Sequence, residues 1–233
     1  MKRPIKIALL SLLVLPVLFA AFAWYTLQPK EQNLALPPNL ISAETKDGMA
    51  LLESSEYKAD FAALDEAYVA QDNISYCGVA SGVAVLKALG ISSSQSDFFT
   101  DAASKVRSRL QVTFGGMTLQ QLDGLLAAHG LETRVVHGDQ IDVDEFRSLL
   151  AQNLSKTGDY VLVNYQREDL GQGRSGHISP VGAYNADADR VLILDTADFK
   201  YPHTWVPLEQ LHNALLEVDS ASERPRGLLE VTL

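Results

Sequence analysis

The sequence predicts an α+β fold in which a mostly helical N-terminal half packs against antiparallel strands of the C-terminal half. Between residues 49 and 154, apolar residues recur mainly at helical spacing. From Tyr160 onward the period changes to two, and the apolar runs are separated by turns or loops. Helices followed by strands are typical of α+β domains. The hydrophobic content of 47% and charged content of 21% are those of a globular protein.

The N-terminal residues differ from this pattern. Residues 1–6 are basic, and residues 7–27 form an uncharged stretch of 21 residues. This exceeds the usual signal-peptide core of about 7–15 residues and suffices for one membrane span of about 20. We therefore expect residues 1–27 to be a signal peptide or an N-terminal membrane anchor, and residues 28–39 to be a linker. The basic flank predicts an exported, periplasmic body, held in the inner membrane by residues 7–27 if the leader is not cleaved.

Charge and cysteine content limit the partners and sites of the body. Without the leader's Lys2, Arg3 and Lys6, 16 basic residues stand against 29 acidic ones, a net charge of −13. Such a surface repels nucleic acid, so we expect no nucleic-acid partner. A single cysteine excludes an intramolecular disulfide and a cysteine-cluster zinc site. Histidine pairs eight and nine residues apart do not share a helical face, so no metal held by the protein is expected.

The helical half is predicted segment by segment. In order, we expect one or two short helices over 49–69, a buried helix from Cys77 to Gly90, a loop with a short helix over 92–110, a helix capped by Thr118 and ending near Gly130, a strand over 133–136, and a helix opened by Asp142 or Asp144 and running through Leu154. The C-terminal half is predicted in the same way. It should contain strands at 160–165, 177–184, 190–195 and 228–233, a Gly-rich loop at 167–175, a turn at 185–189 and an amphipathic helix at 207–218.

Cys77 begins the buried helix, and this position gives a thiol unusual chemistry. Unpaired backbone N–H groups and the positive end of the helix dipole favour the thiolate, the form that attacks carbonyls. The amide of Gln71, six residues upstream, could donate to an oxyanion formed in that attack. The alternative is that a lone cysteine is only a small buried apolar residue.

Two residues of the strand half could complete a catalytic constellation with Cys77. His177 stands at the beginning of one predicted strand, and Asp195 ends the next, so antiparallel pairing could bring them together. The imidazole would take the thiol proton, and the carboxylate would fix its tautomer. Alternatively, His177 is a structural residue and Asp195 caps a turn. The order Gln71, Cys77, His177, Asp195 is that of papain-like thiol enzymes.

Five strings of the sequence occur together in one known family. They are G-M-A-L-L-E-S-S-E-Y-K-A-D-F at 48–61, Q-D-N-I-S-Y-C-G-V-A-S-G-V-A-V-L-K-A-L at 71–89, G-H-I-S-P-V-G-A-Y-N at 176–185, V-L-I-L-D-T-A-D-F-K-Y-P-H-T-W-V at 191–206 and V-D-S-A-S-E-R-P-R-G at 218–227. Residues 40–233 therefore resemble the catalytic domain of phytochelatin synthases. The resemblance implies a papain-like fold and an enzyme whose cysteine attacks the Cys–Gly amide of glutathione. Glycine leaves, and the γ-glutamylcysteinyl thioester passes to a second glutathione or to water.

The resemblance also assigns roles to individual residues. Cys77 would be the nucleophile, His177 the base, Asp195 its orienting acid and Gln71 the oxyanion donor. Asp219 and Arg226 would hold the amino and carboxylate groups of the γ-glutamyl moiety, as their charges suit a zwitterion. Arg167 and Lys200 would contact the second substrate. For Arg226, Arg167 and Lys200 the alternative is an ordinary solvated surface charge.

The acyl acceptor and the partners are less defined by the sequence. Expected partners are glutathione and its metal or S-conjugates, with cadmium or zinc arriving as a glutathione thiolate complex rather than as a cofactor held by the protein. Short bacterial relatives tend to hydrolyse glutathione to γ-glutamylcysteine and glycine, so a purely hydrolytic peptidase is the first alternative. A non-catalytic module that binds thiol peptides and a general cysteine endopeptidase are the others, and a homodimer is left open.

Overall fold

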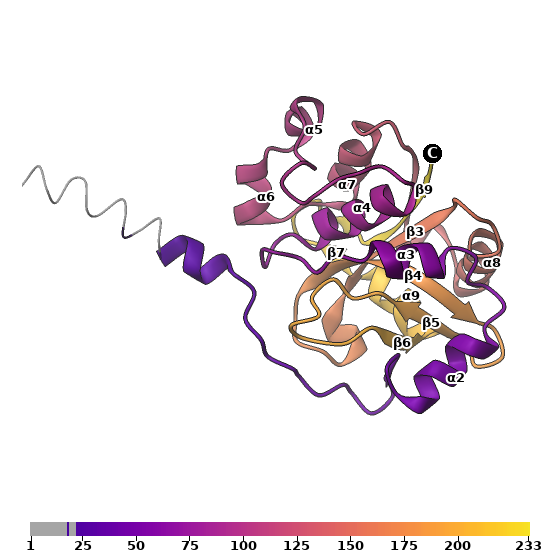
Figure 1. Ribbon diagram of the computed structural model, residues 1–233. Coiled ribbons are helices and arrows are strands. Elements are labelled where there is room, and N and C mark those ends of the chain that lie inside the picture. Colours follow the sequence, from indigo (N-terminus) through magenta and orange to yellow (C-terminus); the bar gives the residue numbers. More distant parts are fainter. Residues whose placement is uncertain (1–17, 19–21) are drawn as a thin grey trace, which may run out of the picture.

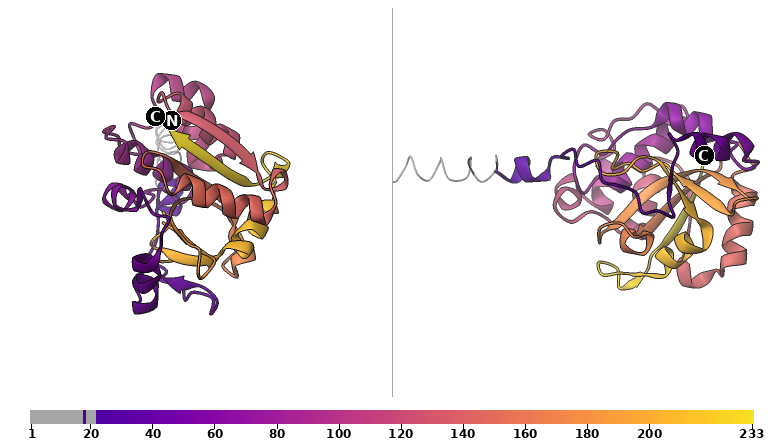
Figure 2. Two further views of the ribbon diagram at one scale, coloured as in Figure 1. Left: turned by 90° about the vertical axis from the view of Figure 1, so that its right-hand side faces the viewer. Right: turned by 90° about the horizontal axis from the view of Figure 1, so that it is seen from below.

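A seven-stranded antiparallel sheet runs through the protein and carries helices on both faces (Figures 1 and 2). The computed structural model describes Leu18 and residues 22–233, so most of the expected leader lies outside the described residues. Within that part of the chain, every helix is too short or too polar to cross a membrane.

The sheet is built mainly from the C-terminal half of the chain. In spatial order its strands are β1 (Ile41–Ser42), β6 (Thr204–Pro207), β5 (Arg190–Ile193), β4 (Gly176–Asn185), β3 (Tyr160–Gln166), β9 (Gly227–Thr232) and β2 (Glu132–His137). A separate two-stranded ribbon joins β7 (Val218–Asp219) to β8 (Arg224–Pro225). The predicted strands at 133–136, 160–165, 177–184, 190–195 and 228–233 are confirmed within one or two residues, whereas the short strands β1 and β6 were not predicted.

The helices follow the predicted order, except that two short helices, α5 and α6, are found where one was expected. They are α2 (Lys46–Ser54), α3 (Phe61–Ala67), α4 (Cys77–Ala88), α5 (Asp101–Val106), α6 (Arg109–Gly115), α7 (Leu119–Ala127), α8 (Val143–Asn153) and α9 (Leu208–Leu216), with short 3₁₀ turns at η1 (Gly138–Gln140) and η2 (Arg167–Leu170). Thr118 and Asp142 cap α7 and α8, each in a complete capping box. The predicted α+β fold, with a helical N-terminal half packed on an antiparallel sheet, is confirmed.

The two faces of the sheet bury different side chains of the same strands. On β3, Tyr160 and Leu162 pack into a core with α4 and α7, whereas Val161 and Val163 pack into a second core with α8 and α9. This follows from the period-two alternation of strand side chains. A strand buried on both faces is apolar at every position, as the run Y-V-L-V-N-Y nearly is.

Helix α4 is the most deeply buried helix, because every residue from Gly78 to Leu86 is covered. It lies between α3, α7 and the strand β4. The Ser81 hydroxyl is 2.8 Å from the carbonyl oxygen of Cys77 and 3.1 Å from that of Ile178, so it ties the start of α4 to β4. A Cβ atom on Gly78 would lie 2.6 Å from Sδ of Met117, so a larger residue would displace this methionine side chain from the wall of the helix.

Part of the segment expected to be a linker pairs with the body. The backbone N–H groups of Gln32 and Leu34 donate to the carbonyl oxygens of Phe199 (2.7 Å) and Lys200 (2.9 Å). Residues 32–34 therefore lie along the loop that follows Asp195, and Figure 1 shows this stretch running beside the body.

Trp205 offers a test of the packing between the sheet and α2. Its ring is fully buried, and Nε1 donates to the carbonyl oxygen of Gly48 at 3.0 Å. Trp205→Ala should lower the free energy of unfolding by about 3–5 kcal/mol, because it leaves a cavity. Trp205→Phe should cost less, about 1–2 kcal/mol, because mainly the hydrogen bond is lost. Urea denaturation measures both, and equal losses would contradict the packing assignment.

Candidate active site

Cys77 lies at the N-terminus of α4 in a cleft of about 320 Å³. The other walls come from the end of α6, the start of β4 and the ribbon β7–β8. They include Gly115, Gly116, Met117, Asn164, Gly176, His177, Asp219, Ser220, Ala221 and Arg226. The residue before the helix, Tyr76, makes no side-chain hydrogen bond to the first turn. The backbone N–H groups of that turn therefore remain available to a sulfur or an oxyanion.

The strand pairing brings His177 and Asp195 together as predicted. Strand β4 begins at Gly176 and pairs antiparallel with β5, and Asp195 follows β5 by two residues. Nε2 of His177 lies 2.9 Å from Oδ1 of Asp195. His177 and Cys77 line the same cleft, and the imidazole lies near enough to lower the pKa of the thiol. Because Nε2 faces the carboxylate, Nδ1 is the ring nitrogen left for the thiol.

The surroundings of this pair favour its charged form. Burial by itself raises the pKa of the Cys77 thiol, but the hydrogen bond and charge of His177, helped by backbone groups of Ile178 and Gly78, hold that pKa below its ordinary value. Burial and the nearby Arg167 lower the pKa of His177, yet Asp195 outweighs both and raises it. Both pKa shifts are in the direction that favours a thiolate beside an imidazolium.

Arg167 does not lie where the resemblance placed it. Its side chain is only 2% exposed, and Nη2 is 2.7 Å from each carboxylate oxygen of Asp195. A guanidinium buried in this way cannot contact a second substrate in the cleft, so that expectation is corrected. Burial raises the pKa of Asp195, but the charge of Arg167, then that of His177, holds it well below its usual range. The sequence signal was weak, because Arg167 begins a polar loop that reads as solvent-exposed.

Gln71 is buried close to the triad but is engaged in local hydrogen bonds. Its Nε2 donates to the carbonyl oxygen of Asn73 at 2.9 Å, and its backbone N–H donates to the carbonyl oxygen of Thr196 at 2.8 Å. Gln71 is not among the residues that line the Cys77 cleft. One amide proton is used by Asn73, and a primary amide carries two. The role of oxyanion donor stays a prediction.

Asp219 and Arg226 both line the Cys77 cleft, as expected for contacts to a substrate. Arg226 is 8% exposed, which excludes the alternative of a solvated surface cation. Its Nη1 donates to Oδ1 of Asn164 at 2.8 Å and lies 4.0 Å from Oδ2 of Asp219. Nε is buried and has no hydrogen-bond partner among the described residues. A Cβ atom on Gly176 would collide with this guanidinium, so glycine beside His177 lets Arg226 enter the cleft.

Lys200 lines a different cavity, of about 410 Å³, together with Glu44, Tyr68, Asp198 and His203. Burial and the nearby Arg167 lower the pKa of Lys200. The Tyr68 hydroxyl, in the wall of this cavity, donates to the backbone carbonyl oxygen of Asp195 at 2.9 Å. The cavity therefore lies close to the triad, but Lys200 is not in the wall of the Cys77 cleft.

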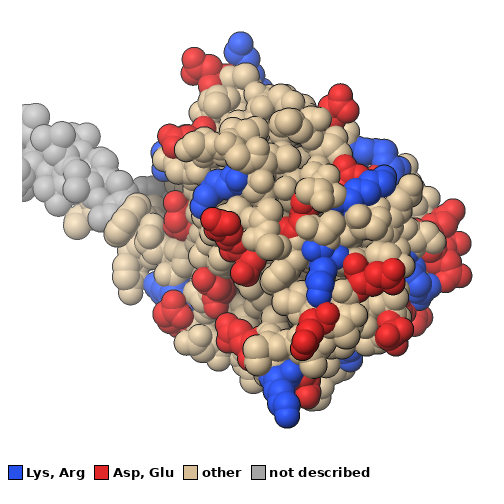
Figure 3. All heavy atoms as spheres, turned by 45° about the vertical axis from the view of Figure 1, so that its right-hand side comes forward, with Lys and Arg blue, Asp and Glu red and all other residues tan. Residues whose placement is uncertain are grey.

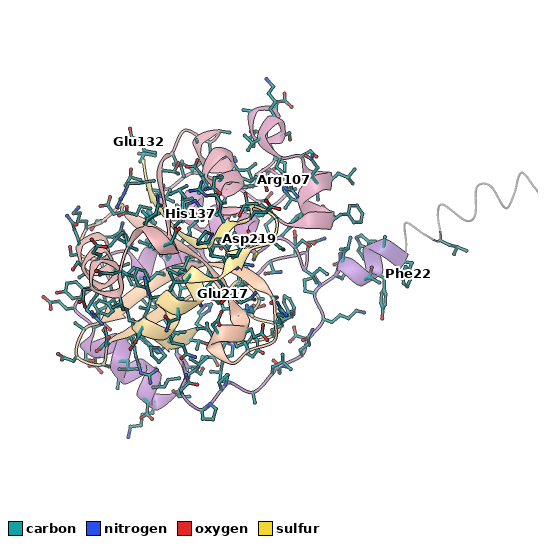
Figure 4. The ribbon with its side chains drawn as sticks, turned by 180° about the vertical axis from the view of Figure 1, so that it is seen from behind. Phe22, Arg107, Glu132, His137, Glu217 and Asp219 are labelled. Carbon is teal, nitrogen blue, oxygen red and sulfur yellow. The ribbon has the colours of Figure 1, made fainter. Side chains whose placement is uncertain are left out.

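A search of the described residues found no cluster of three or more histidine, cysteine or acidic side chains that could hold a metal ion. Figure 4 shows Asp219 and Glu217 together at the ribbon β7–β8, with His137 nearby. His137 is held by the carbonyl oxygen of Pro225 at 2.6 Å from Nδ1. It supports the segment that carries Arg226 and was not singled out as a site residue.

The charge arrangement predicts how Cys77 reacts with iodoacetamide as the pH changes. In the wild type, alkylation should persist below pH 8.5, roughly the pKa of a free thiol. In Asp195→Asn, burial and Arg167 still lower the pKa of His177, and the largest opposing influence is gone. The imidazolium is then lost and the midpoint of alkylation should rise by about one pH unit or more.

Two further variants make this measurement decisive. Asp195→Asn leaves Arg167 buried without its anion, so the double variant Asp195→Asn/Arg167→Met is measured beside it. Asp198→Asn is the matched control and should leave the midpoint in place. Because Arg167 itself lowers the pKa of His177, the double variant should shift less than Asp195→Asn. An unchanged midpoint in Asp195→Asn with native circular dichroism would contradict the assigned ion pair.

Comparison with known proteins addresses the family of the chain. A family model described as phytochelatin synthase matches residues 31–228. Glutathione gamma-glutamylcysteinyltransferase 3 of Lotus japonicus is 31% identical over 71% of this chain and 36% of its own length. Glutathione gamma-glutamylcysteinyltransferase 2 of Arabidopsis thaliana is 28% identical over 85% of this chain and 46% of its own length. The chain thus spans between about one third and one half of these curated relatives.

A fungal relative and one solved structure also match. A glutathione gamma-glutamylcysteinyltransferase of Schizosaccharomyces pombe is 28% identical over 72% of this chain and 42% of its own length. The solved peptidase domain of Streptococcus ComA aligns over 70% of this chain and 96% of that domain. Its TM-score of 0.46 and its sequence identity of 17% are too low to support an argument. The family model, in contrast, covers most of the sequence. The chain therefore belongs to the phytochelatin synthase family.

Proposed function

We propose that this protein is a thiol enzyme that cleaves the Cys–Gly amide of glutathione through a thioester on Cys77. The observation that carries the proposal is that one cleft is lined by Cys77, His177 and the buried guanidinium of Arg226. A nucleophile alone would suit any peptidase. A buried cation facing the same space selects a substrate with a carboxylate at a fixed distance from the scissile bond.

The first half-reaction follows from the charges of the triad. The Cys77 thiolate attacks the carbonyl carbon of the cysteinyl residue of glutathione, and the oxyanion meets the free N–H groups at the start of α4. His177 gives its proton to the leaving nitrogen, glycine departs, and a γ-glutamylcysteinyl thioester remains on Cys77. Asp195 keeps the ring of His177 aligned throughout, and Arg167 keeps Asp195 ionised.

Substrate recognition is assigned to Arg226 and Asp219. Among the described residues the guanidinium of Arg226 donates one hydrogen bond, from Nη1 to Asn164, and its buried Nε has no partner. A guanidinium with a free donor binds a carboxylate well. Asp219 lies 4.0 Å away and would accept from the α-amino group of the same γ-glutamyl moiety. The pair thus complements a zwitterion, which an internal peptide residue does not offer.

The acyl acceptor is either water or the amino group of a second glutathione, free or as a cadmium or zinc thiolate. Hydrolysis is the second candidate function, and one observation favours it. Arg167 is buried against Asp195 and Lys200 lines another cavity, so neither cation expected to hold a second glutathione lines the Cys77 cleft. His177, neutral after the first half-reaction, would then take a proton from water as it attacks the thioester.

Incubation of the protein with glutathione, with and without cadmium, tests the proposal. Mass spectrometry should show glycine with γ-glutamylcysteine, or with longer γ-glutamylcysteinyl polymers if transfer operates. Cys77→Ala should release no glycine, whereas a binding module without catalysis would bind glutathione equally in both proteins. Glutathione with an α-linked glutamate should be spared, because its carboxylate and amino groups are displaced. Equal cleavage of both linkages would indicate a general peptidase instead.

Arg226 and its neighbour Arg224 provide a matched pair for the recognition step. Arg226 is buried in the cleft, whereas Arg224, two residues earlier, is exposed. Arg226→Met should lower kcat/KM for glutathione about 10- to 100-fold, since a hydrogen bond to a charged group contributes roughly 1.5–3 kcal/mol. Arg224→Met should change it less than twofold. Equal effects of the two substitutions in steady-state assays would refute the role of Arg226.

A further inference from the structure

A short cationic segment stands out in this acidic protein. Residues 102–122, which include α6 and most of α5, contain Lys105, Arg107 and Arg109 and no acidic residue, while the body as a whole has a net charge of −13. Figure 3 shows acidic side chains spread widely over one face of the protein. None of the three cations forms an ion pair with another described residue, although Asp72 lies near enough to Arg109 to have its pKa affected.

The same segment exposes large apolar side chains. Leu110 is 68% exposed and Phe114 is 62% exposed, and Val106 and Ile74 are exposed as well. Helix α6 is nevertheless a defined element, because Ser108 and Gln111 form a complete capping box and Val112 anchors the helix in the core. The exposed apolar side chains on its outward face therefore belong to an ordered helix. Single exposed leucines are common, but several together with unpaired cations are not.

This surface adjoins both the cleft and the end of the N-terminal segment. The Tyr76 and Thr113 hydroxyls are 2.7 Å apart, which joins α6 to the loop before Cys77. Ile74 and the last residue of α6, Gly115, both line the Cys77 cleft. The backbone N–H of Ile74 donates to the carbonyl oxygen of Leu27 at 3.0 Å, so the apolar stretch over 7–27 ends at this surface.

The views agree on this placement. The helical residues 22–27 lie toward the same side as α5 and α6 in Figure 1 and in the right-hand view of Figure 2. In Figure 4, Phe22 and Arg107 are again on one side of the molecule. The aromatic side chains of Phe22, Trp24 and Tyr25 are exposed.

We propose that the basic apolar face, made of Ile74, Lys105, Val106, Arg109, Leu110 and Phe114, rests on an anionic lipid bilayer beside the mouth of the active-site cleft. Cations around exposed apolar side chains are what interfacial membrane contacts use. Aromatic residues such as Trp24 and Tyr25 prefer the same interface. A second copy of this chain fits less well, since a two-fold contact through this face would bring like charges together. The inference does not depend on the glutathione activity.

The lone cysteine makes a direct test practical. In a Cys77→Ser background, Phe114→Cys and Ser148→Cys each introduce one thiol, which is labelled with an environment-sensitive nitrobenzoxadiazole dye. Ser148 is exposed on α8, on the far side of the body from α6 in Figure 1. The full-length labelled chains are mixed with vesicles of phosphatidylcholine with or without phosphatidylglycerol, and brominated acyl chains serve as quenchers.

The dye at position 114 should be quenched several-fold more strongly than the dye at 148, and only when phosphatidylglycerol is present. Adding Lys105→Gln and Arg109→Gln should abolish most of the quenching at 114 while circular dichroism stays native. Vesicle-bound protein without quenching at 114, as an N-terminal anchor alone would give, overturns the proposal. So does equal quenching at both positions, or a spectral shift at 114 that follows protein concentration without lipid, which would indicate a second copy.

Discussion

The candidate active site depends on a row of ionisable groups: Arg167 pairs with Asp195, Asp195 pairs with His177, and His177 shares a cleft with the half-buried Cys77. A carboxylate out of water is unstable unless a cation neutralises it, and Asp195 would otherwise take up a proton. Arg167 supplies that cation, with Nη2 at 2.7 Å from both carboxylate oxygens. Asp195 can then stabilise the imidazolium, which in turn stabilises the thiolate. Arg167 thus acts on the nucleophile through two intervening groups.

Close packing of α4 on β4 sets the geometry of this row. Cys77 begins α4 and His177 begins β4, so their distance depends on how closely the helix lies on the strand. The Ser81 hydroxyl holds the two elements together through the carbonyl oxygen of Ile178. A glycine, Gly176, makes room for Arg226 beside His177. Small residues at these positions let a nucleophile, its base and a cation share one cleft.

Much of the fold was predictable because the relevant signals are local. Apolar spacing identified α4, α7 and α8, and Thr118 and Asp142 identified two helix starts through their capping preferences. Strands β1 and β6 were missed, because two- and four-residue strands carry little periodicity and form by pairing with each other and with β5. The catalytic trio was predictable from residue type, chain order and the expectation that neighbouring strands pair.

The sequence by itself determined the two-part α+β architecture, the helix that begins at Cys77 and the family to which the chain belongs. Apolar periodicity, helix caps and sequence motifs can each be recognised within a short stretch of the chain. Only the tertiary structure decided that Arg167 is the buried partner of Asp195, that Arg226 enters the Cys77 cleft and that Lys200 does not. The sequence does not show which of these three basic residues is buried and which lines a cavity. Whether a cation is buried, paired or free depends on which distant segments the fold places around it.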